Sequence, residues 1–368
     1  MLSPREIIRN LPSYHPPLAG RDGLRLDFNE NVDGCSPSVL ACLQSLTTED
    51  LARYPEREPV EADVAKFLGV LNSELLLTNG VDEAIHLLCQ AYIDPGPSQR
   101  DEAIIVVPTY SMYRIYMLAA GAKLVTVPAG PDFQFPADAV LASITQRTRL
   151  IAIANPNNPT GMVAPRQTLL AIAQAAPHAA VLVDEAYFEF NGETLLPERE
   201  NCPNLFIART FSKAYGLAGL RIGAIIGDAG QMRVLRRVSS PYNVNAAALA
   251  CLPAALADQA YIEQYVNEVR ESRIRLETLL HANGIQCWPS HANFVLMRVG
   301  PTAADSIAFV ERMRQRGILI RDRSADYGCE GCVRITLGTR QNTDRLLTVL
   351  QQAIDTRSLI ASATGARP

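Results

Sequence analysis

The sequence predicts an α/β protein with two parts: a large domain around a mostly parallel sheet, and a smaller α+β domain. Short apolar runs rich in β-branched residues alternate with helical segments through the middle of the chain, which is typical of a sheet buried on both faces. The chain has 368 residues, more than a single hydrophobic core of about 250–300 residues usually supports. A long helix, predicted over residues 262–281 from its periodic charged and apolar residues, leads to further strands and helices.

In the large domain, apolar residues recur at helical spacing over residues 60–68, 81–91 and 112–120. The second of these stretches begins directly after the turn Thr78-Asn79-Gly80. Apolar runs bounded by turns predict strands at residues 103–107, 123–127, 150–154, 181–183, 205–208 and 219–227. Because these runs hold few polar residues, we expect helices to cover both faces of the sheet.

The two ends of the chain differ from this pattern. The first forty residues are rich in proline and glycine and contain one short alternating stretch, so we expect an extended arm. A helical region begins at residues 241–258 and continues into the small domain, where strands are predicted at 293–297, 318–320 and 333–337 and helices at 303–316 and 342–355. The last residues, 361–368, should fray. The predicted division is an arm with part of the small domain over 1–45, a large domain over 46–270 and a small domain over 271–368.

The charge balance and the cysteines exclude several classes of protein. The 34 basic and 38 acidic residues give a net charge of −4, and no basic run predicts a nucleic-acid partner. No apolar stretch approaches the roughly 20 residues of a membrane span or resembles a signal peptide, so we expect a cytoplasmic protein without a membrane partner. Cys329 and Cys332 form a C-x-x-C pair, but no further ligands lie at suitable spacing, so we expect reduced thiols and no metal.

The most informative segment runs from Thr210 to Gly223 and reads TFSKAYGLAGLRIG. Its lysine, Lys213, lies among apolar and small residues, where loss of hydration would lower the pKa of the amine. A neutral amine of this kind can attack an aldehyde cofactor. Any single lysine is more often a solvated surface residue, so the neighbouring motifs decide between the two interpretations.

Asp184 follows the very apolar strand predicted at residues 181–183. A buried carboxylate needs a cationic partner, and a protonated pyridine nitrogen would be one, because a protonated ring withdraws electrons from the reacting carbon. Tyr187, three residues later, could donate a hydrogen bond to a ring oxygen. The main alternative for Asp184 is a helix N-cap after the strand.

A phosphorylated cofactor also needs an anion site, and the helix predicted after Gly80 offers backbone N–H groups and the positive end of its dipole. Side chains that could complete the site are hydroxyls and a guanidinium, on Thr210, Ser212 and Arg221. No G-x-G-x-x-G motif follows the early strands, so a dinucleotide is not expected. The rigid turn NPNNPTG at residues 155–161 follows a predicted strand, where open α/β sheets bind ligands, and places Asn155 there.

These pieces together resemble the pyridoxal-phosphate (PLP) aminotransferases of fold type I, class I/II. The motifs are NPNNPTG at residues 155–161, DEAY at 184–187 and SKAYGLAGLRIG at 212–223. Within that group the chain resembles the histidinol-phosphate aminotransferases, on the segments LDFNEN at 26–31, ARYP at 52–55, PYNVN at 241–245, ANFVL at 292–296 and CVRITLGTR at 332–340. The resemblance covers about residues 14 to 350 and implies the aspartate-aminotransferase-like fold.

The resemblance also implies roles for individual residues. Lys213 would be the Schiff-base lysine and the base for the 1,3-proton shift. Asp184 would pair with the pyridinium, Tyr187 and Asn155 would contact the ring oxygen, and Tyr110 would stack on the ring. The phosphate would be held by Gly80, Val81 and Asp82 at the helix start and by Thr210, Ser212 and Arg221.

For the substrate, the resemblance implies that Arg334 binds an anionic group, and Arg321 is the candidate second cation. Tyr54 would reach the cofactor phosphate of a neighbouring subunit, which implies a homodimer with shared active sites; aromatic packing is the alternative for Tyr54 and for Tyr110. The implied reaction converts histidinol phosphate and 2-oxoglutarate into imidazole acetol phosphate and glutamate, a step of histidine biosynthesis. An aromatic aminotransferase, an amino-acid phosphate decarboxylase and a cyclase acting on an arginine derivative remain alternatives. A regulator that reuses the fold would need a DNA-binding module, for which the sequence shows no sign.

Overall fold

The computed structural model describes residues 2–11, 20, 22–94, 96 and 101–364, with side chains to residue 354. Within these residues, a sheet of seven strands has the order β2-β8-β7-β6-β5-β3-β4. All neighbouring pairs are parallel except those made by β8, which is antiparallel to both β2 and β7. The strands are β2 (Leu75–Thr78), β3 (Glu102–Val107), β4 (Lys123–Pro128), β5 (Thr148–Ala154), β6 (Ala180–Asp184), β7 (Leu205–Thr210) and β8 (Gly223–Gly227).

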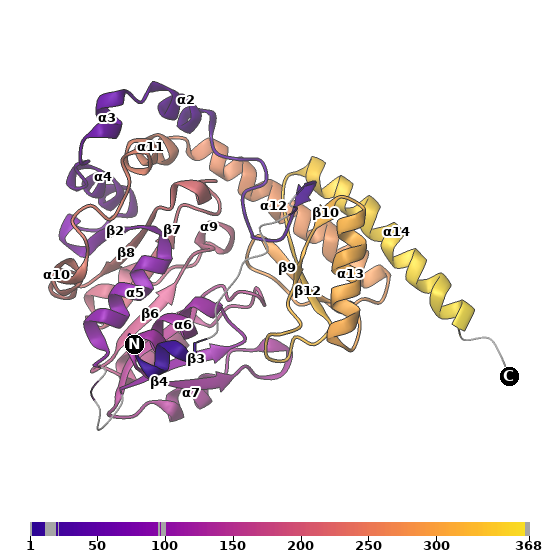
Figure 1. Cartoon of the computed structure of the whole chain (residues 1–368), viewed down its shortest axis with the longest axis horizontal. Coiled ribbons are helices and arrows are strands. Elements are labelled where there is room, and N and C mark those ends of the chain that lie inside the picture. Colours follow the sequence, from indigo (N-terminus) through magenta and orange to yellow (C-terminus); the bar gives the residue numbers. More distant parts are fainter. Residues whose placement is uncertain (1, 12–19, 21, 95, 97–100, 365–368) are drawn as a thin grey trace.

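Successive residues of the central strands enter two different hydrophobic cores. On β5, Ile151 and Ile153 pack on one side of the sheet, whereas Leu150 and Ala152 pack on the other. This alternation confirms the predicted burial of both faces. The covering helices include α4 (Glu58–Leu68), α5 (Gly80–Tyr92), α6 (Ser111–Ala120), α7 (Ala137–Ser143), α8 (Arg166–Ala175), α9 (Phe188–Asn191), α10 (Ala229–Val238) and α11 (Ala246–Ala257) (Figure 1).

Three predicted boundaries were wrong. The helix expected at residues 342–355 runs over Arg340–Thr364, so residues 361–364, which were expected to fray, are helical, and residues 365–368 of that prediction lie outside the described residues. The strand expected at residues 219–227 begins only at Gly223, because residues 218–220 form a 3-10 turn that ends at Arg221 with φ 55°. The helix expected from residue 241 begins at Ala246, because Asn245 is its N-cap and accepts a hydrogen bond from the backbone of Ala248 at 2.8 Å. Strand β2 was not predicted, since a run of three leucines before a threonine favours a helix as much as a strand.

Another sheet among the described residues has three antiparallel strands in the order β11-β12-β9, with β9 at Phe294–Arg298, β11 at Arg321–Asp322 and β12 at Cys332–Thr336. It packs with helices α12 (Gln259–Ala282), α13 (Ala303–Gln315) and α14 (Arg340–Thr364) (Figure 1). The predicted arm reaches this part of the molecule, because β1 (Leu24–Arg25) pairs in parallel with β10 (Ile318–Leu319).

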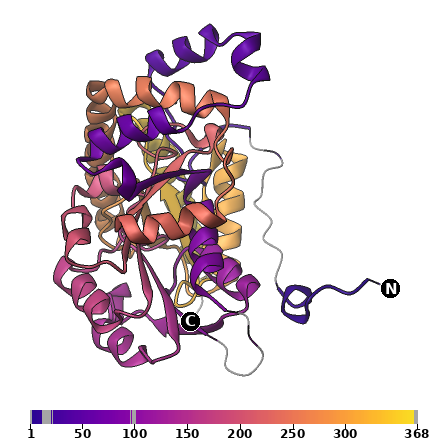
Figure 2. The same cartoon turned by 90° about the vertical axis from the view of Figure 1, so that its left-hand side faces the viewer.

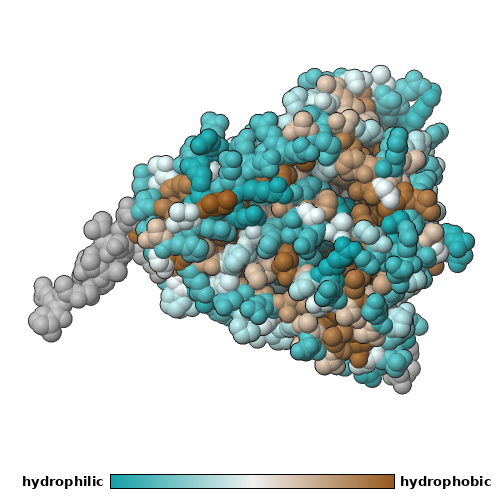
Figure 3. Space-filling view, turned by 180° about the vertical axis from the view of Figure 1, so that it is seen from behind, coloured by the Kyte–Doolittle hydropathy of each residue, from teal (hydrophilic) through white to brown (hydrophobic). Residues whose placement is uncertain are grey.

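The remaining helices are α1 (Glu6–Arg9), α2 (Pro37–Ser45) and α3 (Thr48–Ala52). Figure 2 shows α2 and α3 at one end of the molecule, beyond the large sheet. The rear face carries mostly hydrophilic residues, with hydrophobic ones in separate groups among them (Figure 3). In the described part of the chain, no helix combines the length and the apolar character needed to cross a bilayer.

Candidate functional site

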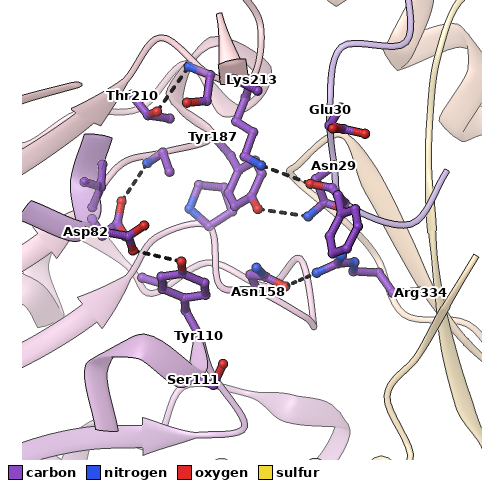
Figure 4. A pocket seen from close by; sticks show the side chains of 18 of the residues that line it. Asn29, Glu30, Asp82, Tyr110, Ser111, Asn158, Tyr187, Thr210, Lys213 and Arg334 are labelled. Atoms are coloured by element: carbon purple, nitrogen blue, oxygen red, sulfur yellow. Dashed lines mark hydrogen bonds between the residues drawn. The ribbon is translucent and has the colours of Figure 1, made fainter. Parts of the chain in front are cut away.

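A cavity of about 530 Å³ lies where the carboxyl ends of β5, β6 and β7 meet the start of α5, the arm and the three-stranded sheet. Figure 4 shows side chains from all of these elements pointing toward one another. The cavity brings together most of the residues that the sequence singled out: Val81, Asp82, Tyr110, Asp184, Tyr187, Thr210, Ser212, Lys213, Arg221, Arg321 and Arg334. Residues separated by some 250 positions in the chain thus form one site.

Lys213 lies just beyond β7, in the tight turn that precedes β8. Its Nζ donates a hydrogen bond to the backbone carbonyl of Phe28 in the arm, at 3.1 Å (Figure 4). Burial, and after it the positive charge of Arg334, lower the pKa of this amine to about 8. The amine is therefore neutral in a useful fraction of molecules near neutral pH, as the sequence predicted.

Asp184 is the last residue of β6, and its carboxylate is buried. The phenolic O–H of Tyr113 donates to Oδ2 at 2.6 Å, and the backbone N–H of Ala186 donates to Oδ1 at 3.0 Å. Burial nevertheless raises the pKa of Asp184 to about 6. The N-cap of α9 is Tyr187, so Asp184 does not cap that helix. A buried carboxylate that faces a cavity and has only neutral partners is suited to a cationic ligand.

Two asparagines near Asp184 have different surroundings. Asn29 of the arm, held with φ 56°, donates from Nδ2 to the phenolic oxygen of Tyr187 at 2.9 Å (Figure 4). Asn155 does not line the cavity itself, although its neighbours Ala154 and Pro156 do. Its Oδ1 accepts a hydrogen bond from the backbone of Ala164 at 2.8 Å, which leaves the amide N–H group as the end that can donate elsewhere.

The start of α5 forms a close backbone cradle. Gly80 has φ +71°, and a Cβ there would lie 2.7 Å from a terminal nitrogen of Arg221. A Cβ on Gly223 would lie 3.2 Å from the backbone nitrogen of Val81, so both positions require glycine. Arg221 makes an exposed ion pair with Asp82 at 3.2 Å. Backbone N–H groups, a guanidinium and the nearby hydroxyls of Thr210 and Ser212 thus lie at one end of the cavity, a set of donors that suits an anion.

Tyr110 also belongs to this end of the cavity. Its phenolic O–H donates to Oδ1 of Asp82 at 2.9 Å (Figure 4), and its ring meets that of Tyr113 edge to face at 5.7 Å. Tyr110 therefore both packs and hydrogen-bonds within the chain. Together with Tyr113 it makes one face of the cavity aromatic.

Arginines form the wall that faces Lys213. Arg334 on β12 is buried, donates to Oδ1 of Asn158 at 2.5 Å and to the carbonyl of Asp27 at 2.7 Å, and has an Nε without a hydrogen-bond partner among the described residues. Burial lowers the pKa of Arg334 to about 9. Arg321 is its direct partner in the pairing of β11 with β12. Both predicted cations therefore reach the cavity from adjacent strands.

Comparisons with known proteins identify the family. A family model described as aminotransferase class I and II matches residues 21–350. The chain belongs to this family. It is 38% identical over 335 residues to the histidinol-phosphate aminotransferase of Roseobacter denitrificans, covering 89% of this chain and 90% of that one. It is 32% identical to the enzyme of the same name from Geobacillus, covering 96% of this chain and 98% of that one.

Solved structures agree with this assignment. The histidinol-phosphate aminotransferase of Sinorhizobium meliloti, in complex with pyridoxal-5'-phosphate, has a TM-score of 0.85 and 29% identity, covering 96% of this chain and 98% of that one. An aspartate aminotransferase of Thermus thermophilus has a TM-score of 0.80 and 25% identity, covering 96% of this chain and 100% of that one. The predicted enzyme class, a PLP-dependent aminotransferase, and the aspartate-aminotransferase-like fold are thereby confirmed.

The site of this aminotransferase fits the cofactor on its own chemistry. It pairs a buried amine of lowered pKa with a buried carboxylate of raised pKa on one cavity. A Cβ would meet the guanidinium of Arg221 at Gly80 and the backbone at Gly223, where the carbonyl oxygen of Arg209 would lie 2.8 Å away. Glycine at both positions therefore keeps the start of α5 open for an anion such as a phosphate. The amine of Lys213 suits the aldehyde, the carboxylate of Asp184 suits the ring nitrogen, and the start of α5 suits the phosphate.

Tyr54, a further predicted site residue of the aminotransferase, does not line the cavity either. Tyr54 is 78% exposed, and its ring stacks on that of Tyr242 with centroids 4.2 Å apart and an angle of 21° between the planes. Its packing within the chain is therefore aromatic, which was the alternative interpretation.

Four functional candidates were missed: Asn29, Tyr113, Asn158 and Arg323 line the cavity but were not singled out. Asn29 and Asn158 lie within the motifs LDFNEN and NPNNPTG. A polar side chain inside a recognised motif was the feature that could have indicated a role in the site. Tyr113 on α6 offered none, because an aromatic residue at helical spacing usually packs in a core. Arg323 looked like one charge among several.

The two cysteines of the C-x-x-C pair of the aminotransferase lie in a buried turn. Cys329 and Cys332 are both buried free thiols, and the backbone N–H of Cys332 donates to the carbonyl of Cys329 at 2.9 Å. In the described part of the chain, no three His, Cys, Asp or Glu side chains gather as a possible metal site.

The lowered pKa of Lys213 can be measured without the cofactor. The chain has only three lysines, Lys66, Lys123 and Lys213, so trace acetylation of each can be followed by peptide mass spectrometry. The neutral amine is the reactive form, and we expect half-maximal labelling of Lys213 near pH 8. In urea-unfolded protein, the midpoint should rise to about 10.4. A native midpoint equal to the unfolded one would contradict the desolvated amine.

Proposed function

We propose that this enzyme transfers the amino group of histidinol phosphate to 2-oxoglutarate, giving imidazole acetol phosphate and glutamate. The observation that carries the proposal is the wall of arginines opposite Lys213, since both substrates present an anion next to the reacting carbon. In histidinol phosphate this anion is the phosphate ester on the neighbouring carbon, and in 2-oxoglutarate it is the carboxylate beside the keto group. Relatives at 38% and 32% identity with the name histidinol-phosphate aminotransferase support the same choice.

Pyridoxal phosphate, when bound, supplies an aldehyde and an electron-withdrawing ring that stabilises negative charge at the substrate Cα. In our proposal, Lys213 carries the aldehyde between turnovers. Its Nζ then accepts the proton from the substrate Cα and later returns a proton. A pKa of about 8 suits both the uptake and the return of the proton, because the amine is present in its charged and its neutral form near pH 7.5.

The floor of the site would hold the ring. Asp184 would keep a proton on the ring nitrogen, and Tyr113 would orient the carboxylate through its hydrogen bond of 2.6 Å. Tyr187 and Asn155 would donate to the ring oxygen, with Asn29 fixing Tyr187. Tyr110 would stack on the ring. The phosphate would be bound by the backbone of Gly80, Val81 and Asp82 and by Thr210, Ser212 and Arg221.

An assay of the purified, PLP-loaded protein tests the proposal. Glutamate formed from 2-oxoglutarate is measured with histidinol phosphate as donor, in parallel with phenylalanine, threonine phosphate and arginine derivatives. We expect the largest kcat/KM with histidinol phosphate. Carbon dioxide release without glutamate would indicate a decarboxylase, a cyclised product would indicate a cyclase, and preference for phenylalanine would indicate an aromatic aminotransferase.

Substitution of the two predicted cations should separate the substrates. Arg334→Lys should lower kcat/KM for both substrates by about 10- to 100-fold, because an ammonium lacks the planar fork that grips an anion. Arg321→Ala should chiefly raise KM for histidinol phosphate, whose phosphate carries more charge than a carboxylate. Steady-state kinetics with each substrate, beside the surface variant Arg275→Ala, give the comparison. Equal effects of Arg321→Ala on both substrates would contradict the assignment.

We further propose a cytoplasmic homodimer in which Tyr54 reaches the neighbouring subunit's cofactor phosphate. Large hydrophobic side chains with exposed fractions of 52–78% lie on α2, on α3 and in the loops after α3 and α10, and support an interface there: Leu40, Leu51, Tyr54 and Tyr242. The proposed division of the chain remains an arm with part of the small domain over 1–45, a large domain over 46–270 and a small domain over 271–368. Sedimentation of the protein, with Tyr54→Phe kinetics, tests the shared site.

A further inference from the structure

A third arginine lines the same cavity as Arg321 and Arg334. The backbone N–H of Arg323 donates to the carbonyl of Cys332 at 3.0 Å, so the pairing of β11 with β12 continues by one residue. Side chains two residues apart on a strand share a face. Because Arg321 faces Arg334 directly, all three guanidinium groups lie on one wall.

Among the described residues, the hydrogen-bond and ion-pair partners of Arg323 and Arg334 supply one carboxylate for two positive charges. Asp326 pairs with Arg323, with Oδ2 lying 2.5 Å from Nε. Arg334 is held by an amide oxygen and a backbone carbonyl and not by a carboxylate. Glu30, which also lines the cavity, makes an ion pair with Arg25 at 2.8 Å. An anionic ligand would supply the missing negative charge.

The ion pair with Asp326 uses only one edge of the Arg323 guanidinium. Asp326 lies at ion-pair distance from Nε, which has no hydrogen-bond partner among the described residues. The two terminal nitrogens likewise make no hydrogen bond to the part of the chain that the structure describes. Asp326 is itself fixed, because its backbone N–H donates to the carbonyl of Arg323 at 3.0 Å in a tight turn. Arg323 is thus held in place with its donors still available.

We propose that Arg323 is a specificity-determining residue that favours a phosphate monoester over a carboxylate, with Asp326 as its positioning residue. A phosphate monoester presents three terminal oxygens and about −1.5 to −2 charges at pH 7, whereas a carboxylate presents two oxygens and one charge. One guanidinium group can grip a carboxylate through two parallel hydrogen bonds, and each further arginine adds a contact that the phosphate uses more fully. This inference rests on the proposed function, because it concerns the anion of the phosphorylated donor.

The test measures binding and not turnover. The probes are n-propyl phosphate and butyrate, which share a propyl chain, lack an amino group and differ in the anion. Their dissociation constants are measured by calorimetry on the PLP-loaded enzyme, whose own phosphate site is filled. For Arg323→Gln we expect weaker binding of propyl phosphate by about 10-fold or more, and of butyrate by less than about 3-fold. The control Arg275→Gln removes an equal charge from the exposed pair with Asp344 and should change neither constant.

Asp326→Asn supplies the second variant, because the amide oxygen can still accept from Nε and keep Arg323 in position while the negative charge is lost. The loss of that charge should strengthen binding of propyl phosphate more than of butyrate, since the extra positive charge acts on a dianion. If Arg323→Gln weakens both probes equally, or neither, or only lowers the melting temperature, Arg323 is a structural residue and the inference is overturned. Failure of the wild type to use histidinol phosphate, with the selectivity for propyl phosphate intact and lost in Arg323→Gln, would refute the proposed donor and leave the role of Arg323 standing.

Discussion

Lys213→Ala is expected to abolish amino transfer while the fold and part of the cofactor affinity remain. The variant loses the amine that carries the aldehyde and the base that moves the Cα proton. Loss of the proton transfer alone should lower the rate by about 10²- to 10⁴-fold. Single-turnover formation of glutamate, followed after mixing enzyme, donor and 2-oxoglutarate, gives the rate.

The matched control is Lys66→Ala, which removes an exposed lysine of α4. It should keep the wild-type rate. Cofactor retained after gel filtration should fall in Lys213→Ala but not vanish, because the phosphate cradle and Asp184 are unchanged. Turnover of Lys213→Ala at the wild-type rate would refute the role of this amine.

Asp184→Asn is expected to have opposite effects on activity and on the stability of the cofactor-free protein. An amide cannot hold a proton on the ring nitrogen by charge, so turnover should fall by about 100-fold or more. Without the cofactor, the carboxylate has a pKa of about 6 against an ordinary value of 3.8. The folded state then binds more protons than the unfolded state between those values, so this group lowers stability as pH rises from about 4 through 6.

The neutral amide avoids that loss, so cofactor-free Asp184→Asn should be more stable than the wild type above pH 6, by on the order of 1–3 kcal/mol. At pH 4 the two proteins should differ little. Urea unfolding at both pH values, with and without PLP, measures the effect. If the substitution leaves the rate and the pH dependence of stability unchanged, Asp184 has only a local structural role.

The sequence was most informative where a single physical constraint dominates. Strands such as β5 and β6 are apolar on both faces, so their positions followed from composition alone. The motif around Lys213 combines a lysine, hydroxyls, glycines and an arginine within a few residues, a combination that rarely arises by chance. In the structure, Thr210, Ser212, Lys213 and Arg221 of this motif line one cavity.

Prediction failed where the decisive contact is distant. Strand β11 has two residues, too few for a period of two to be seen, and so the side on which Arg323 lies could not be inferred. Tyr113 reaches Asp184 across 71 positions of sequence. The position of Tyr54 beside Tyr242 likewise depends on the approach of two loops.

The amino-terminal arm makes completion of the site a late event in folding. Phe28 contacts Lys213 across 185 positions, and Asp27 contacts Arg334 across 307. Contacts of such long range pay the entropy of closing large loops before they gain stability, and they slow folding. During synthesis, the contact between Asp27 and Arg334 can therefore form only after β12 has left the ribosome. The reactive amine obtains its final environment only when the first and last parts of the site have met.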